Sequence, residues 1–292
     1  MRYAAIDIGS NAVRLLIADI IERENEVGFN KNTLLRVPLR LGDDAFIHQH
    51  ISEGKFENMV KTMSAFRNLM DVYRVTDYMA CATSAMRDAD NGKEVVEACS
   101  KAGIDIKIID GAEEAQIIYN VHSHTNMDKN KVYLYIDVGG GSTEISLFAN
   151  GELVASRSFN LGTIRILDNQ DSPETWDDMK VWVKNITKSY KTIYGIGSGG
   201  NINKLSRMAN EKADKPISYA KLKAMYVYLS SYSLKDRINV LELKQDRADV
   251  IIPASEIFLT IMKVGHLKNI MAPRIGLADG IIQTLINTNF KK

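Results

Sequence analysis

The sequence predicts a two-domain α/β protein, and three observations carry this prediction. Strand-like and helix-like segments alternate along both halves of the chain, which is typical of layered α/β folds. A pattern of strand, aspartate, glycine turn and strand occurs twice, at residues 6–11 (IDIGSN) and 136–143 (IDVGGGST). The length of 292 residues exceeds what one small hydrophobic core requires. The repeated pattern therefore indicates two similar half-molecules that face each other across a cleft.

The first half of the chain predicts strands and helices in alternation. Residues 3–20 predict two strands around the first glycine turn, and residues 34–41 predict a strand that ends at a Gly-Asp-Asp turn. An apolar stripe at helical spacing predicts a helix over residues 52–73, with its core formed by Phe56, Met59, Val60, Met63, Phe66 and Met70. Further elements are a strand at 77–83, helices opening at 84 and 92, a strand at 104–109 and a helix from 110 through 119.

The second half repeats this organisation after a polar, turn-rich segment at 122–131. Strands are predicted around the second glycine turn and at 153–159, and Ser172-Pro173 begins a helix that runs to about residue 190. A strand at 193–196 leads into a glycine turn at 197–201. The rest is predicted to be mostly helical, interrupted by Pro253 and Pro273. The predicted domains are residues 1–124 and 125–276, with the last helix, 277–292, returning to the first.

Composition limits the classes of partner. The net charge of +1 creates no overall field that would attract nucleic acid or a membrane, so neither partner is expected. The two cysteines are Cys81 and Cys99, and the first lies in an apolar strand-like run, which favours a reducing compartment over a disulfide. No signal peptide and no apolar run of about 18 residues is recognised. A cytoplasmic location is the resulting expectation.

The two glycine turns predict two phosphate-binding loops. Glycine lets backbone N–H groups approach an anion closely. The expected phosphate-binding residues are Gly9, Ser10 and Asn11 in one loop and Gly139, Gly140, Gly141, Ser142 and Thr143 in the other. A tight hairpin alone explains one glycine but not three in a row.

An aspartate ends the strand before each loop. Asp7 and Asp137 can hold a hydrated Mg²⁺ ion, or another divalent cation, against the same phosphates. The structural alternative is an aspartate that bonds to its own turn. The occurrence of both aspartates in matched contexts favours the metal role.

Seven segments of the chain resemble motifs of the Ppx/GppA phosphatases, which comprise exopolyphosphatases and guanosine pentaphosphate phosphohydrolases. They are residues 5–11, 82–87, 111–115, 137–144, 161–162, 197–200 and 247–253. The resemblance implies the two-domain, actin-like fold of sugar kinases, Hsp70 and actin, which is ribonuclease H-like, with an interdomain cleft. It implies the short form, without the additional helical domain of longer members. Two segments depart from the family pattern: Asn201 stands where a threonine is usual, and Ala278-Asp279 where Arg-Glu is frequent.

The resemblance also implies catalytic residues. Glu114 matches the second glutamate of the family's paired-glutamate motif and is expected to orient and deprotonate the attacking water. A carboxylate in the first turn of a helix beside a phosphate site can accept such a proton, although acidic residues favour first turns in any helix. Glu113 lies about 100° round the helix and is expected to be structural. Arg87 is placed near the scissile phosphate, where a guanidinium stabilises the charge on the transferring group.

The function predicted from these residues is metal-assisted hydrolysis of a terminal phosphoanhydride with release of orthophosphate. Inorganic polyphosphate is the first choice of substrate, which makes the protein an exopolyphosphatase. The pentaphosphate nucleotide pppGpp is the alternative, because it presents the same terminal anhydride. Two other classes stay open: a phosphotransferase on the same fold, and a polyphosphate- or nucleotide-binding regulator without turnover. The family is compatible with a homodimer, but no stripe in the sequence marks an interface.

Overall fold

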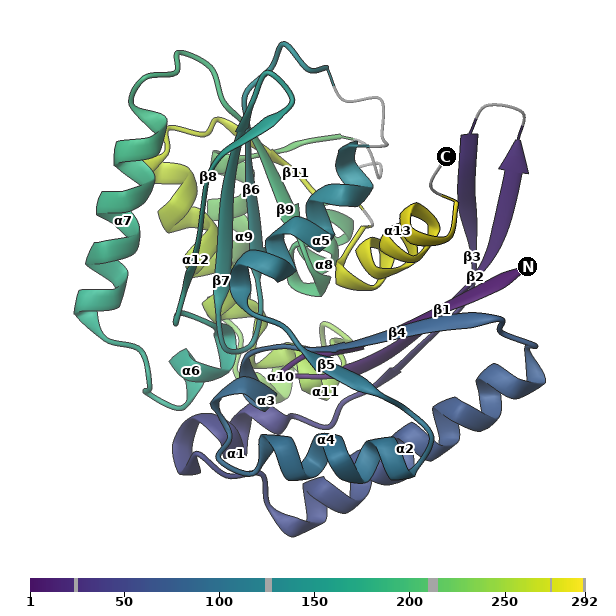
Figure 1. Ribbon diagram of the computed structural model, residues 1–292. Coiled ribbons are helices and arrows are strands. Elements are labelled where there is room, and N and C mark those ends of the chain that lie inside the picture. The colour runs from purple at the N-terminus through teal and green to yellow at the C-terminus, as the bar shows by residue number, and fades with distance from the viewer. Residues whose placement is uncertain (24–25, 124–127, 210–214, 274, 291–292) are drawn as a thin grey trace. The chain divides into compact units, whose positions relative to one another are not determined.

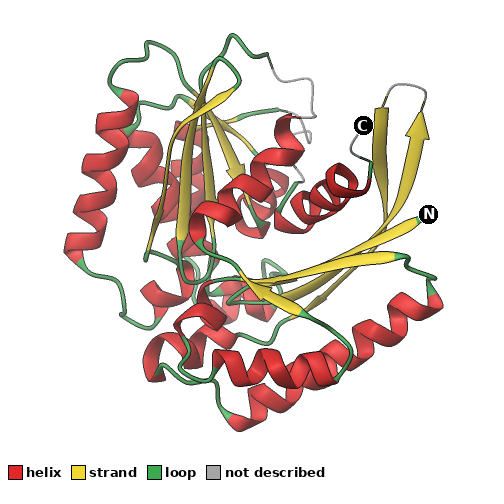
Figure 2. Ribbon diagram, viewed as in Figure 1, coloured by secondary structure: helices red, strands yellow, loops and turns green. Residues whose placement is uncertain are grey.

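The computed structural model describes residues 1–23, 26–123, 128–209, 215–273 and 275–290. Within it the chain forms two compact units, Met1–Thr125 with Ile275–Lys292, and Asn126–Arg274. Each unit contains one β-sheet with helices packed on it (Figure 2). The predicted boundary between residues 124 and 125 lies outside the described residues. The last helix belongs to the first unit.

The first unit contains a five-stranded sheet in the order β3-β2-β1-β4-β5 (Figure 1). Strands β1 and β4 are parallel, as are β4 and β5, whereas β1, β2 and β3 form an antiparallel meander. The elements are β1 (Arg2–Ile8), β2 (Val13–Arg23), β3 (Glu26–Val37), α1 (Leu41–His48), α2 (Glu53–Val72), β4 (Asp77–Ala82), α3 (Ser84–Asp88), α4 (Gly92–Lys101), β5 (Ile106–Ile108), α5 (Gly111–Ser123) and α13 (Leu277–Asn289).

Both faces of this sheet are buried, so its central strands are almost continuously apolar, as expected for a sheet covered on two sides. Helices α5 and α13 pack on one face, where Tyr3 and Ala5 of β1 meet Ile281 and Ile282 of α13. Helices α2 and α4 lie on the opposite side of the sheet (Figure 1). Four residues of the predicted apolar stripe of α2 are confirmed as core, because Met59, Met63, Phe66 and Met70 are all at most 2% exposed. The other two, Phe56 and Val60, are half-buried.

The second unit contains a six-stranded sheet in the order β10-β11-β9-β6-β7-β8. Its elements are β6 (Tyr133–Val138), β7 (Thr143–Ala149), β8 (Glu152–Phe159), α6 (Thr163–Leu167), α7 (Pro173–Thr187), β9 (Tyr194–Ser198), α8 (Gly200–Met208), β10 (Ile217–Ser218), α9 (Tyr219–Ser230), α10 (Leu234–Asn239), α11 (Gln245–Ala248), α12 (Ile251–Val264) and β11 (Asn269–Met271). The apolar helix α12 packs against α7, α8, α9 and β6, and Phe258 at its centre is fully buried.

The two units repeat one arrangement. In each, a three-stranded antiparallel meander is followed by a short helix: β1-β2-β3-α1 in the first unit and β6-β7-β8-α6 in the second. In each sheet, the first strand of the meander also pairs in parallel with a later strand, β4 or β9. The prediction of two similar half-molecules from the repeated glycine-turn pattern is thus matched by the topology.

Strand β3 and helix α1 differ from the prediction. Strand β3 begins at Glu26 rather than at residue 34, because an edge strand carries polar residues that hide its alternation. The predicted Gly-Asp-Asp turn at 42–44 lies inside α1. A helix of eight residues is too short to show a helical period in the sequence.

The second unit also contains elements that the sequence reading missed. The short elements α6, α8 and β11 were not predicted. Pro253 does not interrupt a helix, because it is the third residue of α12. It is tolerated there because the N–H groups of a first helical turn have no intrahelical acceptor.

The described residues contain neither a disulfide nor a membrane-spanning helix. Cys81 and Cys99 are both free, as expected; both are also buried, and burial raises the pKa of each thiol to about 12. Among the described residues, no helix has the length and apolar character needed to cross a membrane.

Candidate phosphate-binding and hydrolysis site

The topology of the first unit gathers most of its predicted site residues at one edge of the sheet. Strands β1, β4 and β5 run parallel, so their carboxyl ends lie at the same edge. The segments that leave these ends are the first glycine loop, the turn into α3 with Arg87, and the turn into α5 with Glu114. Direct contacts join neighbouring segments: the Ser10 and Ser84 hydroxyl oxygens are 2.9 Å apart, and both residues are buried.

The first loop is closed and held by main-chain hydrogen bonds. The Gly9 N–H donates to the Ala12 carbonyl over 3.2 Å. The Ser10 carbonyl accepts from the Gly42 N–H over 2.9 Å, and the Asn11 carbonyl accepts from the Arg40 N–H over 3.1 Å. The start of α1 therefore occupies the carbonyl side of this loop.

Asp7 lies at the end of β1 and is 4% exposed. Its carboxylate accepts a hydrogen bond from Arg14, which stands directly opposite in the antiparallel β1–β2 register. The carboxylate is thus neutralised within the unit, and a direct bond to a metal ion there would compete with Arg14. A water-mediated role remains compatible with this geometry.

Arg87 and Glu114 are linked through the end of β5. The Arg87 Nη1 donates to the carbonyl of Ile109 over 2.7 Å, and Ile109 immediately precedes the turn into α5. Asp110 caps α5, because its Oδ1 accepts from the Glu113 N–H at 2.8 Å. Glu114 is 8% exposed, and the exposed neighbour Glu113 binds Lys107 instead. Glu113 is thus paired within the unit, and the catalytic role of Glu114 stays a prediction.

The position of α5 depends on a close crossing with α13. A methyl group at Gly280 would lie 2.3 Å from the Ile117 carbonyl oxygen of α5. Only glycine permits this approach. Because Ile117 follows Glu114 by three residues, the crossing also fixes the turn that carries the proposed base.

The second loop shows most clearly what the site can bind. The first residues of α6 donate hydrogen bonds to the carbonyls of the loop. The Thr163 N–H donates to the Gly139 carbonyl over 3.0 Å, and the Ile164 N–H donates to the Gly140 carbonyl over 2.8 Å. The Arg165 Nε donates to the Gly141 carbonyl over 2.7 Å. In a trans peptide, the carbonyl of one residue points away from the N–H of the next. The N–H groups of Gly140, Gly141 and Ser142 therefore point away from α6.

None of these three N–H groups donates to another residue in the described part of the chain. Successive backbone N–H groups on one side of a loop form an anion-binding concavity. Phosphate oxygens are suitable acceptors for such donors. The loop thus has the donor arrangement that phosphate binding needs.

Thr143 is placed differently from the other predicted loop residues. Its side chain is fully buried, and its hydroxyl donates to the Leu161 carbonyl over 2.5 Å. Thr143 therefore anchors the loop to the segment before α6. Any contribution to phosphate binding would come from its main chain.

The second predicted metal partner is Asp137. It is partly exposed at the end of β6, and its Oδ1 would lie 3.1 Å from a methyl group at Gly199, so the carboxylate rests against that glycine turn. Its register neighbour Glu144 is buried and accepts from Ser158 over 2.8 Å. Within the described ranges no group of three His, Cys, Asp or Glu side chains is placed to hold a metal ion. A Mg²⁺ ion that keeps several waters and takes its other ligands from phosphate fits a single carboxylate.

Sequence reasoning missed the residues that hold the loops from behind. A methyl group at Gly162 would lie 2.3 Å from the Gly140 carbonyl oxygen and 2.5 Å from the Gly141 carbonyl carbon. In the sequence, Gly162 belongs to a family motif but carries no sign of this contact. Arg40 and Arg165 gave no signal, since single arginines are usually surface residues.

Comparison with known proteins shows what the chain is similar to. Residues 20–289 match the Ppx/GppA phosphatase family. A Haemophilus influenzae protein that bears the name of an exopolyphosphatase is 25% identical over 298 residues, covering 97% of this chain and 90% of that protein. A Photobacterium profundum guanosine-5'-triphosphate,3'-diphosphate pyrophosphatase is 24% identical over 301 residues, covering 98% of this chain but only 59% of the relative.

Structural comparison gives the same result for the fold. The crystal structure of an exopolyphosphatase from Cytophaga hutchinsonii superposes with a TM-score of 0.86 at 21% sequence identity. The match covers 99% of this chain and 98% of that one, so the whole fold is shared. The chain belongs to the Ppx/GppA phosphatase family and has its two-domain, actin-like α/β fold.

Proposed function

We propose that this protein hydrolyses the terminal phosphoanhydride of inorganic polyphosphate and releases orthophosphate. The observation that supports the proposal most is the set of three N–H groups of Gly140, Gly141 and Ser142, which lie on the side of the loop away from α6. Membership of a phosphatase family supports hydrolysis as the reaction. The first loop is built in the same way, because the start of α1 donates to the Ser10 and Asn11 carbonyls.

The proposed chemistry depends on positioning and charge. Phosphoryl transfer passes through a loose transition state with charge spread over the transferring oxygens, so donors fixed in advance lower the barrier most. The loop N–H groups are such donors, because α6 holds their peptide planes. Arg87, whose guanidinium is anchored on Ile109, adds charge stabilisation. Glu114 orients water and accepts its proton.

A divalent cation is part of the proposal, with Mg²⁺ as the first candidate. Asp137 would hold it, and Asp7 would contribute through water because Arg14 already occupies its carboxylate. When bound, the cation would neutralise charge on the phosphate oxygens.

The alternative substrate is pppGpp, and the name of the Photobacterium relative supports it. This chain spans 59% of that relative, so the relative's activity is no guide to the whole reaction here. A phosphotransferase or a binding regulator would use the same N–H groups without releasing orthophosphate from the substrate alone.

Orthophosphate release tests the proposal. Long polyphosphate, short polyphosphate and pppGpp would be offered separately with Mg²⁺, and Glu114→Gln would be compared with Glu113→Gln. We expect Glu114→Gln to lower kcat by about 10²-fold or more, the usual contribution of a general base, with KM near the parent value. Glu113→Gln should keep most of the activity. An unchanged kcat in Glu114→Gln would contradict the assignment, and no release from any substrate would favour the regulator or the transferase.

A further inference from the structure

Helix α1 begins at a residue with an unusual backbone conformation. Its N-cap, Arg40, has φ 49° and ψ 47°, in the left-handed region, and no side chain caps the helix. N-cap residues are normally extended. The other non-glycine residues of positive φ in the described ranges follow a helix end or lie in a hairpin turn, where this conformation is common; they are Gln49, Arg74, Asn150, Asn169, Glu242 and His266. Arg40 therefore needs something that holds it.

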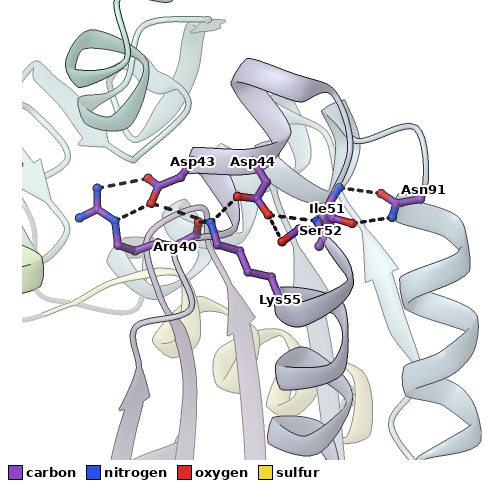
Figure 3. A network of polar contacts seen from close by, with 7 residues as sticks. All are labelled: Arg40, Asp43, Asp44, Ile51, Ser52, Lys55 and Asn91. Carbon is purple, nitrogen blue, oxygen red and sulfur yellow. Dashed lines mark hydrogen bonds and ion pairs between the residues drawn. The ribbon is translucent and has the colours of Figure 1, made fainter.

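Two contacts hold Arg40: its guanidinium binds the Asp43 carboxylate over 2.9 and 3.2 Å, and a lysine from the next helix binds its carbonyl. The Lys55 Nζ donates to the Arg40 carbonyl over 2.6 Å and to the Asp44 Oδ1 over 2.7 Å (Figure 3). Asp44 also accepts from the Ser52 N–H at 3.0 Å, which fixes the carboxylate at the start of α2. Burial opposes ionisation of Asp44, but the hydrogen bonds from Lys55 and Ser52 outweigh it and lower its pKa. We call Arg40, Asp44, Ser52 and Lys55 the Lys55 clamp.

The Lys55 clamp is connected to the first phosphate loop by Arg40 itself. The carbonyl of Arg40 is bound by Lys55, while its N–H donates to the Asn11 carbonyl over 3.1 Å. Two residues further on, the Gly42 N–H donates to the Ser10 carbonyl over 2.9 Å. A change in the backbone of Arg40 would therefore move the hydrogen bonds on the carbonyl side of this loop.

The second unit contains a counterpart of this arrangement. There the start of α6 donates to the loop carbonyls, and the Arg165 side chain binds the Gly141 carbonyl directly. Both loops are thus held by the first turn of a short helix together with a cationic side chain. In the first unit the cationic side chain is that of Lys55 in α2. It binds the carbonyl of Arg40, and Arg40 binds the loop through its N–H.

We propose that Lys55 is a positioning residue for the first phosphate loop. Its ammonium group holds Arg40 in the left-handed conformation, and the Arg40 N–H in turn holds the loop in the shape that presents its N–H groups to phosphate. This inference rests on the proposed function, because the loop's shape affects turnover only if the loop binds the reacting phosphate. Lys55 itself does not touch the substrate.

Replacing Lys55 by methionine keeps the apolar stem and removes the donors. We expect kcat for polyphosphate to fall about tenfold with KM within about twofold, because a sub-ångström misplacement of fixed donors acts on the transition state. Lys61→Met is the matched control, since Lys61 lies on the same helix, is 71% exposed and pairs only with Glu57 at 3.0 Å among the described residues. Lys55→Arg, which can still donate to both acceptors, should restore most of kcat.

A double-mutant cycle separates the positioning role from a general loss of stability. Glycine adopts the left-handed region without cost, so Arg40→Gly makes the backbone less dependent on Lys55. The substitution also removes the Arg40–Asp43 ion pair, so the effect of Lys55→Met is compared within each background. Lys55→Met should lower kcat about tenfold in the parent but at most about twofold in the Arg40→Gly background. Equal losses in the two backgrounds, measured well below both melting temperatures, would overturn the proposal.

Amide hydrogen exchange tests the same proposal without turnover. The N–H groups of Arg40 and Gly42 donate to the loop, so Lys55→Met should speed their exchange about tenfold or more while Lys61→Met leaves it unchanged. Unchanged exchange in Lys55→Met would refute the clamp. If the parent released no orthophosphate from any substrate, the proposed function would fail, and the exchange rates would still decide whether Lys55 holds the loop.

Discussion

Gly162→Ala should displace the second phosphate loop by a distance that follows from the structure. The added methyl group would lie 2.3 Å from the Gly140 carbonyl oxygen, 2.4 Å from its carbonyl carbon and 2.5 Å from the Gly141 carbonyl carbon. Ordinary contact begins near 3.4 Å, so the two segments must separate by about 1 Å. All three obstructing atoms belong to the backbone, and no side-chain rotation can relieve the overlap.

The consequence for catalysis should exceed the consequence for stability. Overpacking of this kind costs about 1–3 kcal/mol of unfolding free energy. A misplacement of about 1 Å in a catalytic array lowers turnover by about 10²-fold, which corresponds to about 2.7 kcal/mol in the barrier. The assay is kcat for polyphosphate at 20 °C together with urea unfolding.

Gly54→Ala is the matched control for this substitution. Gly54 lies in α2 with nothing within 4 Å of the added methyl group, so kcat should stay at the parent value. Stability should rise by up to about 1 kcal/mol, because alanine is the better helix former. A folded Gly162→Ala variant with kcat within twofold of the parent would refute the argument that Gly162 sets the loop's position.

Three further predictions concern the metal partner, the α5–α13 crossing and a buried carboxyl. Asp137→Asn should raise the Mg²⁺ concentration for half-maximal rate by about tenfold or more. The control is Glu144→Gln, which should leave that concentration unchanged because the Glu144 carboxylate binds Ser158. Equal Mg²⁺ profiles for both variants would contradict a role of Asp137 in metal binding. Gly280→Ala should lower the unfolding free energy by about 1–3 kcal/mol, because the added methyl group overlaps the Ile117 carbonyl. An unchanged free energy in urea unfolding would mean that α5 and α13 can separate without cost. Burial raises the pKa of Asp279 above its usual 3.8, although the nearby Lys31 acts in the opposite direction. The contribution of Asp279 to the unfolding free energy is therefore full below pH 3.8 and is lost as the pH rises through the folded pKa. Asp279→Asn should remove that part of the pH dependence, and superimposable stability–pH curves would contradict it.

The sequence predicted the parts of the fold that carry long apolar runs. Strands β1, β2, β6 and β7 and helix α2 were recognised, because a buried strand or a long amphipathic helix shows a clear pattern. The short helices α1 and α6 were missed although they hold the loops. Elements of five to eight residues have too few positions to show a period.

The site was predictable where a local pattern encodes the chemistry. The loops at Gly9 and Gly139 could be read from glycine turns between strands. The Asp7–Arg14 pair was also within reach, since a tight hairpin centred between residues 10 and 11 places residue 7 opposite residue 14. The arginine neutralises the carboxylate that the sequence pattern alone assigns to metal.

The supports behind the loops were not predictable in this way. Gly162 contacts Gly140 from 22 positions away, and Lys55 reaches the first loop only through Arg40, so both roles depend on tertiary packing. A single glycine or lysine carries no pattern that specifies such a partner.

The central claim is that the N–H groups of Gly140, Gly141 and Ser142 bind phosphate. The most direct test is a titration of the Glu114→Gln protein with polyphosphate, followed through the amide resonances of these three residues. We expect saturable shifts of all three resonances, larger than those of amides outside the two loops, and the loss of these shifts in Gly162→Ala. Saturable binding that leaves these three resonances in place would contradict this claim.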